Sequence, residues 1–430
     1  MARVDPSIVP GRVGTLLTML IGVLSEAGPG ERRVALTPEA VTGLVAARPP
    51  GPGRPAAERG GADQAPAGPA GAAGPSSAEE PSADPDAVEV VVQAGAGSHI
   101  HATDDDYIAA GARIAASAQE IAAQADLLAV VGWPERQTLG ALREGAAIVG
   151  LLDPYQQADS VFAARDGGAT AYALELVPRI SRAQSLDALS SQALVAGYRA
   201  TLVGAQLLPK FFPLFMTAAG TIPPARVLVL GAGVAGLQAI ATARRLGAVV
   251  HGYDVRSAAA DEVRSLGATF VDLGLETREG TGGYAAAQTA DFATRQHEAL
   301  APHIAAADVV ITTAAIPGRT APLLITAQMA AAMRPGSVIV DLAAQTGGNC
   351  ELSKPGVTEV HGGVTVWGGA DVPSQLPVHA SKLYAANITA FTALLRAGDL
   401  DDEVLAGCRV TAGGAIVHEG VRNVLEKSDS

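Results

Sequence analysis

The segment PRISRAQSLDALSSQ, residues 178–192, concentrates side chains that form hydrogen bonds, in a chain of which only 17% is charged. It contains two arginines, Gln184, Asp187 and four serines. Guanidinium, amide, carboxylate and hydroxyl groups together can fix the orientation of a polar ligand. A simpler interpretation is that Ser185 or Asp187 caps the helix that follows. The residues by themselves leave both interpretations open.

A second segment, ARVLVLGAGVAGLQAIATARRLGAVVHGYDVR, has the spacing of a dinucleotide-binding turn. The apolar stretch Val227–Leu230 predicts a buried parallel strand. Glycines at the three fixed positions permit a tight turn, an approach of the backbone to a pyrophosphate, and close packing of helix on strand. The start of the next helix would then offer free N–H groups to the phosphates. The predicted cofactor contacts here are Gly231, Gly233, Val234, Ala235 and Gly236.

Asp254 follows the next predicted strand, where a carboxylate can accept hydrogen bonds from ribose hydroxyls. Its charge would repel a 2′-phosphate, which favours NAD(H) over NADP(H). Arg256 points the other way, because a nearby arginine can accommodate a 2′-phosphate. We include Val255 and Arg256 among the predicted contacts, and we weigh Asp254 more heavily. A glycine turn that serves packing alone is the alternative.

The elements that must position these residues alternate between strand and helix, which indicates parallel β/α units. A long helix is expected at Asp187–Leu208, and a closing helix at Ser381–Leu395 within 378–395. The fold class predicted is α/β, with two Rossmann-like, doubly wound parallel-sheet domains joined by two long helices and a ligand cleft between them. The strands expected are 22–24, 88–93, 127–131, 146–151, 169–174, 227–230, 248–253, 269–272, 309–313, 338–341 and 364–367.

The predicted domain boundaries follow from composition along the chain. Residues 1–18 form an N-terminal extension, with Met19 as an alternative start. The first domain covers 19–185 and is closed by the helix 378–395. It contains an insertion, 48–87, that is dominated by Pro, Gly, Ala and Ser and is predicted to be disordered. The Rossmann domain covers 186–377, and 396–430 is a C-terminal tail.

Composition excludes several classes of function. The net charge of −13 gives no basic footprint for nucleic acid. With only Cys350 and Cys408, a disulfide framework or a four-cysteine metal site is excluded, and no metal is expected. No charge-free apolar run reaches the length of a membrane span, so no direct membrane insertion is expected. The apolar run Val13–Leu24 lacks a convincing cleavage site, and a cytoplasmic location is expected.

These segments, with VVITTAAIPGRTAPLLIT and MRPGSVIVDLAAQTGGNC, resemble the NAD(H)-binding component of proton-translocating NAD(P) transhydrogenase. The resemblance covers roughly residues 19–387 apart from the insertion, with several long motifs in the same order. It implies that residues 178–192 form the loop beside the nicotinamide. Matched by spacing, the loop's functional residues are Arg179, Gln184, Asp187 and Ser190.

The resemblance also implies contacts elsewhere in the chain. The segment GTGGYAAA corresponds to a mobile loop, with Gly283 and Tyr284 closing over the nucleotide. Ala315 and Leu342 follow strands at the edge where nucleotides bind.

As partners, the resemblance implies a membrane-spanning subunit and a beta subunit that carries NADP(H). This chain would bind NAD(H), form a homodimer and lie on the cytoplasmic face of the inner membrane through its partners. Hydride would pass directly from NADH to NADP⁺, coupled to proton translocation across the membrane.

Two other functions remain open at this point. An alanine dehydrogenase-like oxidoreductase would need an ionisable Lys and His in the first domain. The corresponding stretches VVGWPERQ and IVGLLDPYQ contain neither residue, and His99 and His101 lie in another turn that is expected to face solvent. A non-catalytic NAD-binding regulator would also fit the absence of acid/base groups.

Overall fold

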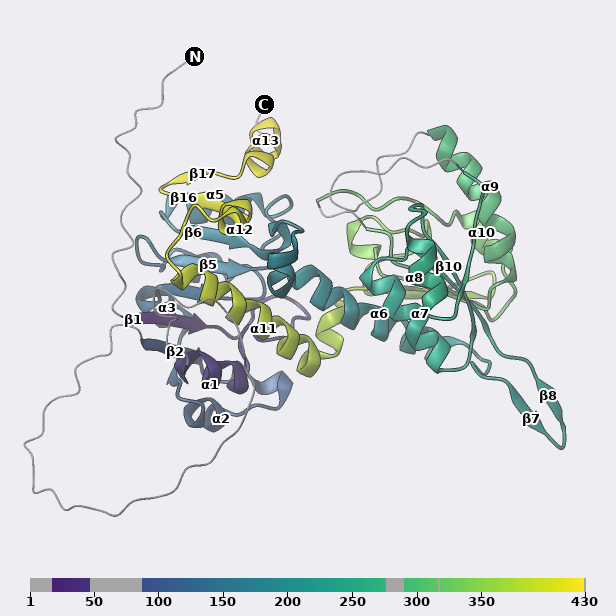
Figure 1. Ribbon diagram of the computed structural model, residues 1–430, viewed down its shortest axis with the longest axis horizontal. Coiled ribbons are helices and arrows are strands. Elements are labelled where there is room, and N and C mark those ends of the chain that lie inside the picture. The colour runs from purple at the N-terminus through teal and green to yellow at the C-terminus, as the bar shows by residue number, and fades with distance from the viewer. Residues whose placement is uncertain (1–17, 47–86, 276–289, 316–317, 429–430) are drawn as a thin grey trace, which may run out of the picture.

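The computed structural model describes residues 18–46, 87–275, 290–315 and 318–428. The predicted extension, except its last residue, and the predicted insertion, except Ala87, lie outside these residues. The described chain forms two α/β lobes that stand side by side, with two long helices at their junction (Figure 1). The predicted fold class is confirmed.

The first lobe contains an eight-stranded sheet in the order β17-β16-β6-β5-β4-β1-β2-β3. Strands β1 to β6 are parallel and follow the doubly wound order 3-2-1-4-5-6. β4 and β5 are buried at every position, as expected for central strands covered on both faces. The strands are β1 (Thr18–Val23), β2 (Ala87–Gln93), β3 (Arg113–Ala115), β4 (Leu127–Ala129), β5 (Ala147–Gly150), β6 (Thr170–Ala173), β16 (Arg409–Ala412) and β17 (Ala415–Ile416).

The second lobe contains a seven-stranded sheet in the order β11-β10-β9-β12-β13-β15-β14. Six strands are parallel in the same doubly wound order, and β14 is antiparallel at the edge. The strands are β9 (Arg226–Leu230), β10 (Val249–Tyr253), β11 (Thr269–Phe270), β12 (Val309–Thr312), β13 (Val338–Asp341), β14 (Thr358–His361) and β15 (Val364–Gly368).

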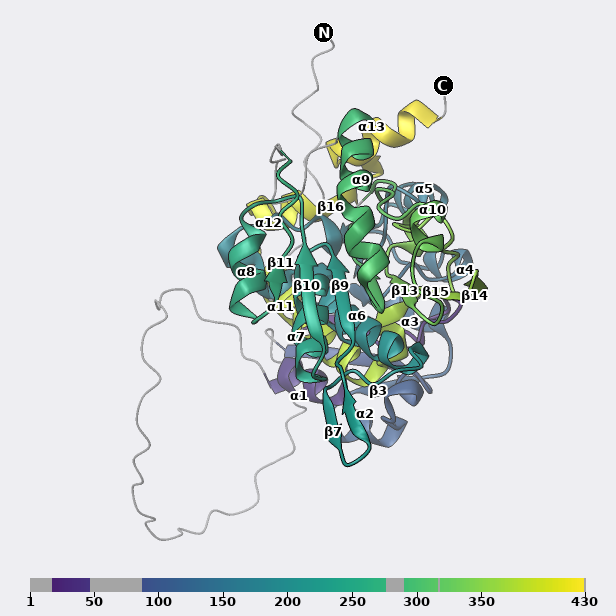
Figure 2. The same cartoon turned by 90° about the vertical axis from the view of Figure 1, so that its right-hand side faces the viewer.

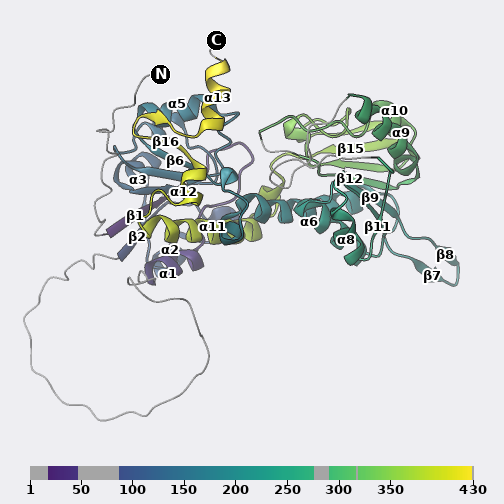
Figure 3. The ribbon, with the colours of Figure 1, turned by 45° about the horizontal axis from the view of Figure 1, so that its top comes forward.

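Helices cover both faces of each sheet (Figures 1 and 3). Around the first sheet lie α1 (Pro38–Ala46), α2 (Asp104–Ala109), α3 (Ala118–Gln124), α4 (Arg136–Leu139), α5 (Ala158–Asp166), α12 (Glu403–Cys408) and α13 (Glu419–Ser428). Around the second lie α7 (Val234–Arg245), α8 (Ala259–Ser265), α9 (Ala290–Ala306) and α10 (Ala327–Ala331). Short 3₁₀ turns are η1 (Ser98–Ile100), η2 (Leu174–Leu176), η3 (Ser181–Leu186), η5 (Ala344–Thr346) and η6 (Val372–Gln375).

Two long helices connect the lobes, α6 (Ala188–Leu207) and α11 (Pro377–Arg396). The first residue of α6 belongs to the first lobe's core, whereas Ala200 and Val203 belong to the second lobe's core. α11 returns to the first lobe and buries Tyr384 and Phe391 there. Both helices agree with the prediction, although α11 begins before residue 378 because Pro377 occupies its first turn.

The chain after residue 395 is not a tail in this structure. α12 follows, and β16 pairs antiparallel with β6, while β17 pairs antiparallel with β16. Val410 and Ile416 lie in the core of the first lobe. The chain therefore adds two strands to an edge that β6 would otherwise leave open.

A two-stranded hairpin, β7 (Phe215–Thr217) and β8 (Gly220–Ile222), projects from the second lobe (Figures 1 and 2). Every residue of both strands is exposed, including Met216 at 77%. This hairpin lies between the end of α6 and β9, and sequence reasoning did not predict it.

Candidate functional site

The glycine turn between β9 and α7 has the geometry that the sequence predicted. Gly231 has a φ of 99°, a left-handed conformation that favours glycine. A Cβ on Gly236 would lie 1.8 Å from the carbonyl oxygen of Gly231, so only glycine allows the helix to pack this close. A Cβ on Gly233 would meet no atom of the described chain within 4 Å, which leaves open space beside the backbone for a ligand.

The first turn of α7 is accessible at this point. Gly233 and Val234 are exposed, and Ala235 is half-buried. Gly233 is the N-cap residue, and no side chain among the described residues caps the helix. The uncapped N–H groups and the positive end of the helix dipole therefore suit a pyrophosphate.

Asp254 stands beside the turn, at the end of β10. One carboxylate oxygen accepts from the N–H of Ala232 at 2.7 Å. The other accepts from the backbone N–H and the Nε of Arg256, at 2.8 Å and 3.0 Å, and an Nη of Arg256 reaches the first oxygen at 3.2 Å. The Asp254 side chain is only 8% exposed. Its charge is thus paired with Arg256, and a ribose hydroxyl would replace the bonds from that side chain.

Asp341 and Asn349 stabilise the loops that follow β12 and β13, and sequence reasoning missed both. Asp341 accepts from Thr312 Oγ1 at 2.9 Å and from the N–H of Asn349 at 2.9 Å. The Asn349 amide exchanges hydrogen bonds with the backbone of Ala314, at 3.0 Å and 2.8 Å. Asp341 did carry a signal, a carboxylate at the end of an apolar strand, whereas the role of Asn349 depends on two loops that meet only in the fold.

The structure places Ala315 and Leu342 at the carboxyl ends of β12 and β13, next to the glycine turn. Ala315 is exposed, and Leu342 is half-buried. The bond from Gly231 to this region runs through Thr313, whose Oγ1 donates to the Gly231 carbonyl at 3.1 Å. The predicted contacts Gly283 and Tyr284 lie outside the described residues.

The polar loop of residues 178–192 occupies the other end of α6. Asp187 caps the helix, because its carboxylate accepts from the N–H of Ser190 at 2.9 Å and from its hydroxyl at 2.6 Å. Arg179 and Gln184 are exposed on the same loop. Arg182 donates to Asp402 at 2.8 Å, which ties the loop to the start of α12. Capping therefore explains Asp187 and Ser190, but it does not involve the side chain of Gln184.

α6 brings the two parts of the site into one frame. A Cβ on Gly197 would lie 2.0 Å from the carbonyl oxygen of Ala235, so α6 and α7 touch backbone to backbone. Asp187 lies ten residues before Gly197 on the same helix. At a rise of 1.5 Å per residue, the polar loop lies about 15 Å along the helix axis from the start of α7.

A buried ion pair in the first lobe lies close to this junction. Arg33 donates to Glu31 at 2.6 Å and to Gln192 of α6 at 2.9 Å, and Ser374 of η6 donates to Glu31 at 2.5 Å. Burial would raise the pKa of Glu31, but the bonds and charge of Arg33 outweigh it and lower the pKa to about 2. The arginine is therefore already neutralised by its neighbour. His99 and His101 are exposed, as expected.

Comparison with known proteins extends over most of the chain. Family models described as "Alanine dehydrogenase/PNT, N-terminal domain" and "Alanine dehydrogenase/PNT, C-terminal domain" match residues 72–196 and 200–419. The first part of the divided NAD(P) transhydrogenase subunit alpha of Rhodospirillum rubrum is 42% identical over 418 residues, 93% of this chain and 98% of that protein. Alanine dehydrogenase of Mycobacterium tuberculosis is 35% identical over 270 residues, 62% of this chain and 67% of that protein.

Solved structures agree with these matches. A transhydrogenase from Sinorhizobium meliloti has a TM-score of 0.74 and 38% identity, and the match covers 93% of this chain and 99% of that one.

Proposed function

The chain belongs to the alanine dehydrogenase/PNT family, and from this membership we propose that it is the NAD(H)-binding component of a proton-translocating NAD(P) transhydrogenase. In this role it holds NADH while hydride passes directly to NADP⁺ on a partner subunit. The observation that carries the proposal is the exposed polar loop, Arg179 and Gln184 above all, on the same helix that abuts the start of α7. The loop would face the nicotinamide half of a nucleotide whose pyrophosphate lies at that turn.

The residues fit a dinucleotide on their own geometry. The open space at Gly233 and the uncapped N–H groups of α7 match a pyrophosphate. When bound, NADH supplies the hydride, so the chain needs no nucleophile. Asp187 holds Ser190 in place, and Arg179, Asp187 and Ser190 offer donors and acceptors for a carboxamide. Catalysis of this kind consists of orientation and exclusion of other geometries.

The preference for NADH over NADPH depends on Asp254 and Arg256 as a pair. The arginine offsets part of the negative charge that would repel a 2′-phosphate. We therefore propose a preference for NAD(H) that Asp254 creates and Arg256 moderates.

The proposed partners are a membrane-spanning subunit and an NADP(H)-binding beta subunit, which would hold the chain at the cytoplasmic face of the inner membrane. Within the part of the chain that the structure describes, no helix could cross a membrane. We propose a homodimer as well. The exposed apolar hairpin supports it, because apolar patches on a surface usually mark contacts with another chain.

Amino-acid dehydrogenation fits the first lobe poorly. The ends of β4 and β5 carry Val131, Trp133, Leu152 and Asp153, and no lysine or histidine is present there. The buried Arg33, which might have bound a carboxylate, is paired with Glu31. We expect no NADH to form from NAD⁺ and L-alanine.

Reconstitution tests the proposed function. The purified chain would be mixed with the membrane and NADP(H)-binding subunits of a relative in vesicles, and hydride transfer and proton uptake would be recorded together. Transfer that requires all components is the expected result. NADH binding without any transfer would favour the non-catalytic regulator, and formation of NADH with L-alanine would favour the dehydrogenase.

A further inference from the structure

The first lobe contains a cavity of about 280 Å³ that the proposed function does not use. It lies at the carboxyl ends of β1, β2, β3 and β4, where Leu24, Gln93, Ala116 and Val130 contribute to its wall. The chain passes from β1 to β2 on one side of the sheet, and β4 lies on the other side of β1. In doubly wound sheets ligands bind at such a switch of strand order.

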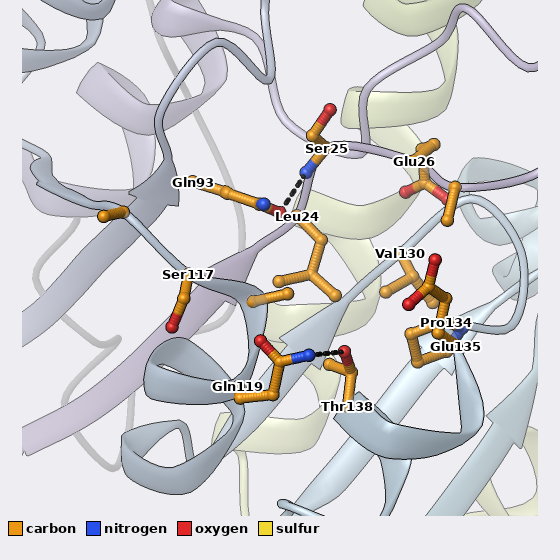
Figure 4. Close-up of a pocket in the computed structure, with 13 residues that line it drawn as sticks. Leu24, Ser25, Glu26, Gln93, Ser117, Gln119, Val130, Pro134, Glu135 and Thr138 are labelled. Atoms are coloured by element: carbon orange, nitrogen blue, oxygen red, sulfur yellow. Dashed lines mark hydrogen bonds between the residues drawn. The ribbon is translucent and has the colours of Figure 1, made fainter.

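The polar groups around the cavity come from two sides (Figure 4). Gln93, Ser117 and Gln119 lie on one side, and Glu26 and Glu135 lie on the other. Among the described residues, no lysine, arginine or histidine lines the cavity. A phosphate or carboxylate would therefore meet two carboxyl groups and no counter-charge, so an anionic ligand is disfavoured.

Hydrogen bonds hold several of these side chains in fixed positions. The Glu26 carboxylate accepts from the N–H groups of Val131 and Gly132 at 2.7 Å and 3.3 Å. Gln93 accepts from the N–H of Ser25 at 2.9 Å. Gln119 donates to Thr138 at 3.3 Å, which leaves its amide oxygen as an acceptor. The cavity is thus rigid and rich in acceptors before any ligand enters.

We propose that this cavity binds a small organic cation, a protonated amine that also carries a hydroxyl or another hydrogen-bonding group. Its ammonium would lie between Glu26 and Glu135, and its second polar group would meet the amides of Gln93 and Gln119. A metal ion is a poorer match, because the described residues contain no group of three or more Asp, Glu, His or Cys side chains that could hold one. The volume lies just below the roughly 300–1,000 Å³ of drug-sized ligand sites and excludes a dinucleotide.

Proton exchange gives the proposal a second signature. Burial raises the pKa of Glu26 to about 8, so its carboxyl is mostly protonated at neutral pH. A bound ammonium would favour the ionised form, so binding should release a proton and strengthen as pH rises from 6 to 9. The charged and titratable groups near Glu26 are Glu31 and Arg33 on its own loop, Tyr384 on α11, and Glu135 across the cavity.

The test uses the full-length chain and three probes of one size, ethanolamine hydrochloride, ethylene glycol and sodium glycolate, observed by saturation-transfer NMR. Ethanolamine should bind at least ~10-fold more tightly than either of the others, and more tightly at pH 9 than at pH 6. Glu26→Gln keeps the shape of the side chain and should abolish this preference. Glu144→Gln, an exposed control in the same lobe, should leave it unchanged.

Several outcomes would overturn the proposal. They are glycolate or ethylene glycol binding as tightly as ethanolamine, Mg²⁺ binding where ethanolamine does not, and an unchanged preference in Glu26→Gln. If Glu26→Gln fails to fold by circular dichroism, Glu135→Gln takes its place with the same expected loss. Failure to detect ethanolamine up to 100 mM with the folded wild-type chain would also reject the site. None of these outcomes bears on NADH binding.

Discussion

Asn387, on α11, donates from its amide to the carbonyl of Ser185 at 2.8 Å and so fastens the polar loop from behind. The same amide accepts from Ser191 Oγ at 2.8 Å, which joins the loop to the first turn of α6. Asn387 is buried and makes no part of the exposed surface of the loop. It therefore sets where Gln184 and Asp187 lie without reaching any ligand itself.

We predict that Asn387→Ala reduces hydride transfer more than NADH affinity. A displacement of the loop by about 1 Å is enough to slow transfer on the order of 100-fold, whereas the contacts at the glycine turn stay intact. Single-turnover stopped-flow with the partner subunits gives the rate, and a fluorescence titration gives the affinity. Lys382→Ala, an exposed control on α11, should change neither. Equal losses of rate and affinity would mean that Asn387 serves folding only.

Gln184→Asn tests the loop from its exposed side. The shorter side chain removes the reach toward the second nucleotide but leaves the helix cap in place, because capping depends on Asp187 and Ser190. NADH binding should stay nearly unchanged, and transfer should fall on the order of 100-fold. An unaffected rate would reduce the loop to a helix cap.

The Asp254–Arg256 pair predicts opposite effects of two substitutions. Asp254→Ala should weaken NADH binding by about 1.5–3 kcal/mol and narrow the difference between NADH and NADPH. Arg256→Ala should widen that difference, because the carboxylate would then repel a 2′-phosphate without compensation. Titrations of both nucleotides with both variants decide the matter. A wider gap in Asp254→Ala would contradict the assignment.

The hairpin predicts the oligomeric state. Met216→Lys places a charge on the most exposed large apolar side chain of the described residues, and it should shift the chain from dimer to monomer in sedimentation equilibrium. Ile108→Lys alters a side chain that is 54% exposed in the other lobe and should leave the dimer intact. A dimer that resists Met216→Lys would place the interface elsewhere.

Glu26 predicts how stability changes with pH. The unfolded chain loses this proton near its ordinary pKa of 4.5, whereas the folded chain keeps it up to a pKa of about 8. The free energy of unfolding therefore falls between these values as pH rises. Glu26→Gln removes this loss, so relative to wild type it should gain about 3 kcal/mol at pH 9 over its value at pH 5. Urea titrations at both pH values measure it, and a gain at pH 5 instead would reverse the sign.

Local pattern was enough to predict the parallel strands and both long helices. Apolar runs such as Val309–Thr312 can only be buried strands in a chain where helices alternate with them. The pairing of β16 with β6 was out of reach, because the side chain of Thr411 meets the backbone of Ala171, 240 residues away in sequence. The RVTAGGAIV stretch did carry a hairpin signal in its two glycines.

The site was predicted in part for the same reason. Glycine spacing is local, so the turn at Gly231 could be predicted from sequence. The clamp by Asn387 and the ion pair between Arg33 and Glu31 depend on elements that meet only after folding. Arg256 stood in the sequence as a counter-signal, but its pairing with Asp254 needed coordinates to be seen.

The contact of Gly197 with Ala235 has a consequence for the evolution of this chain. Both lobes grip α6 within ten residues, one at Ala188 and one at Gly197. One inserted residue in that interval would turn one lobe against the other by about 100° and separate them by about 1.5 Å. Insertions can therefore accumulate almost anywhere along the outer surface, but the spacing between these two grips is a fixed length that sets the aperture between the lobes.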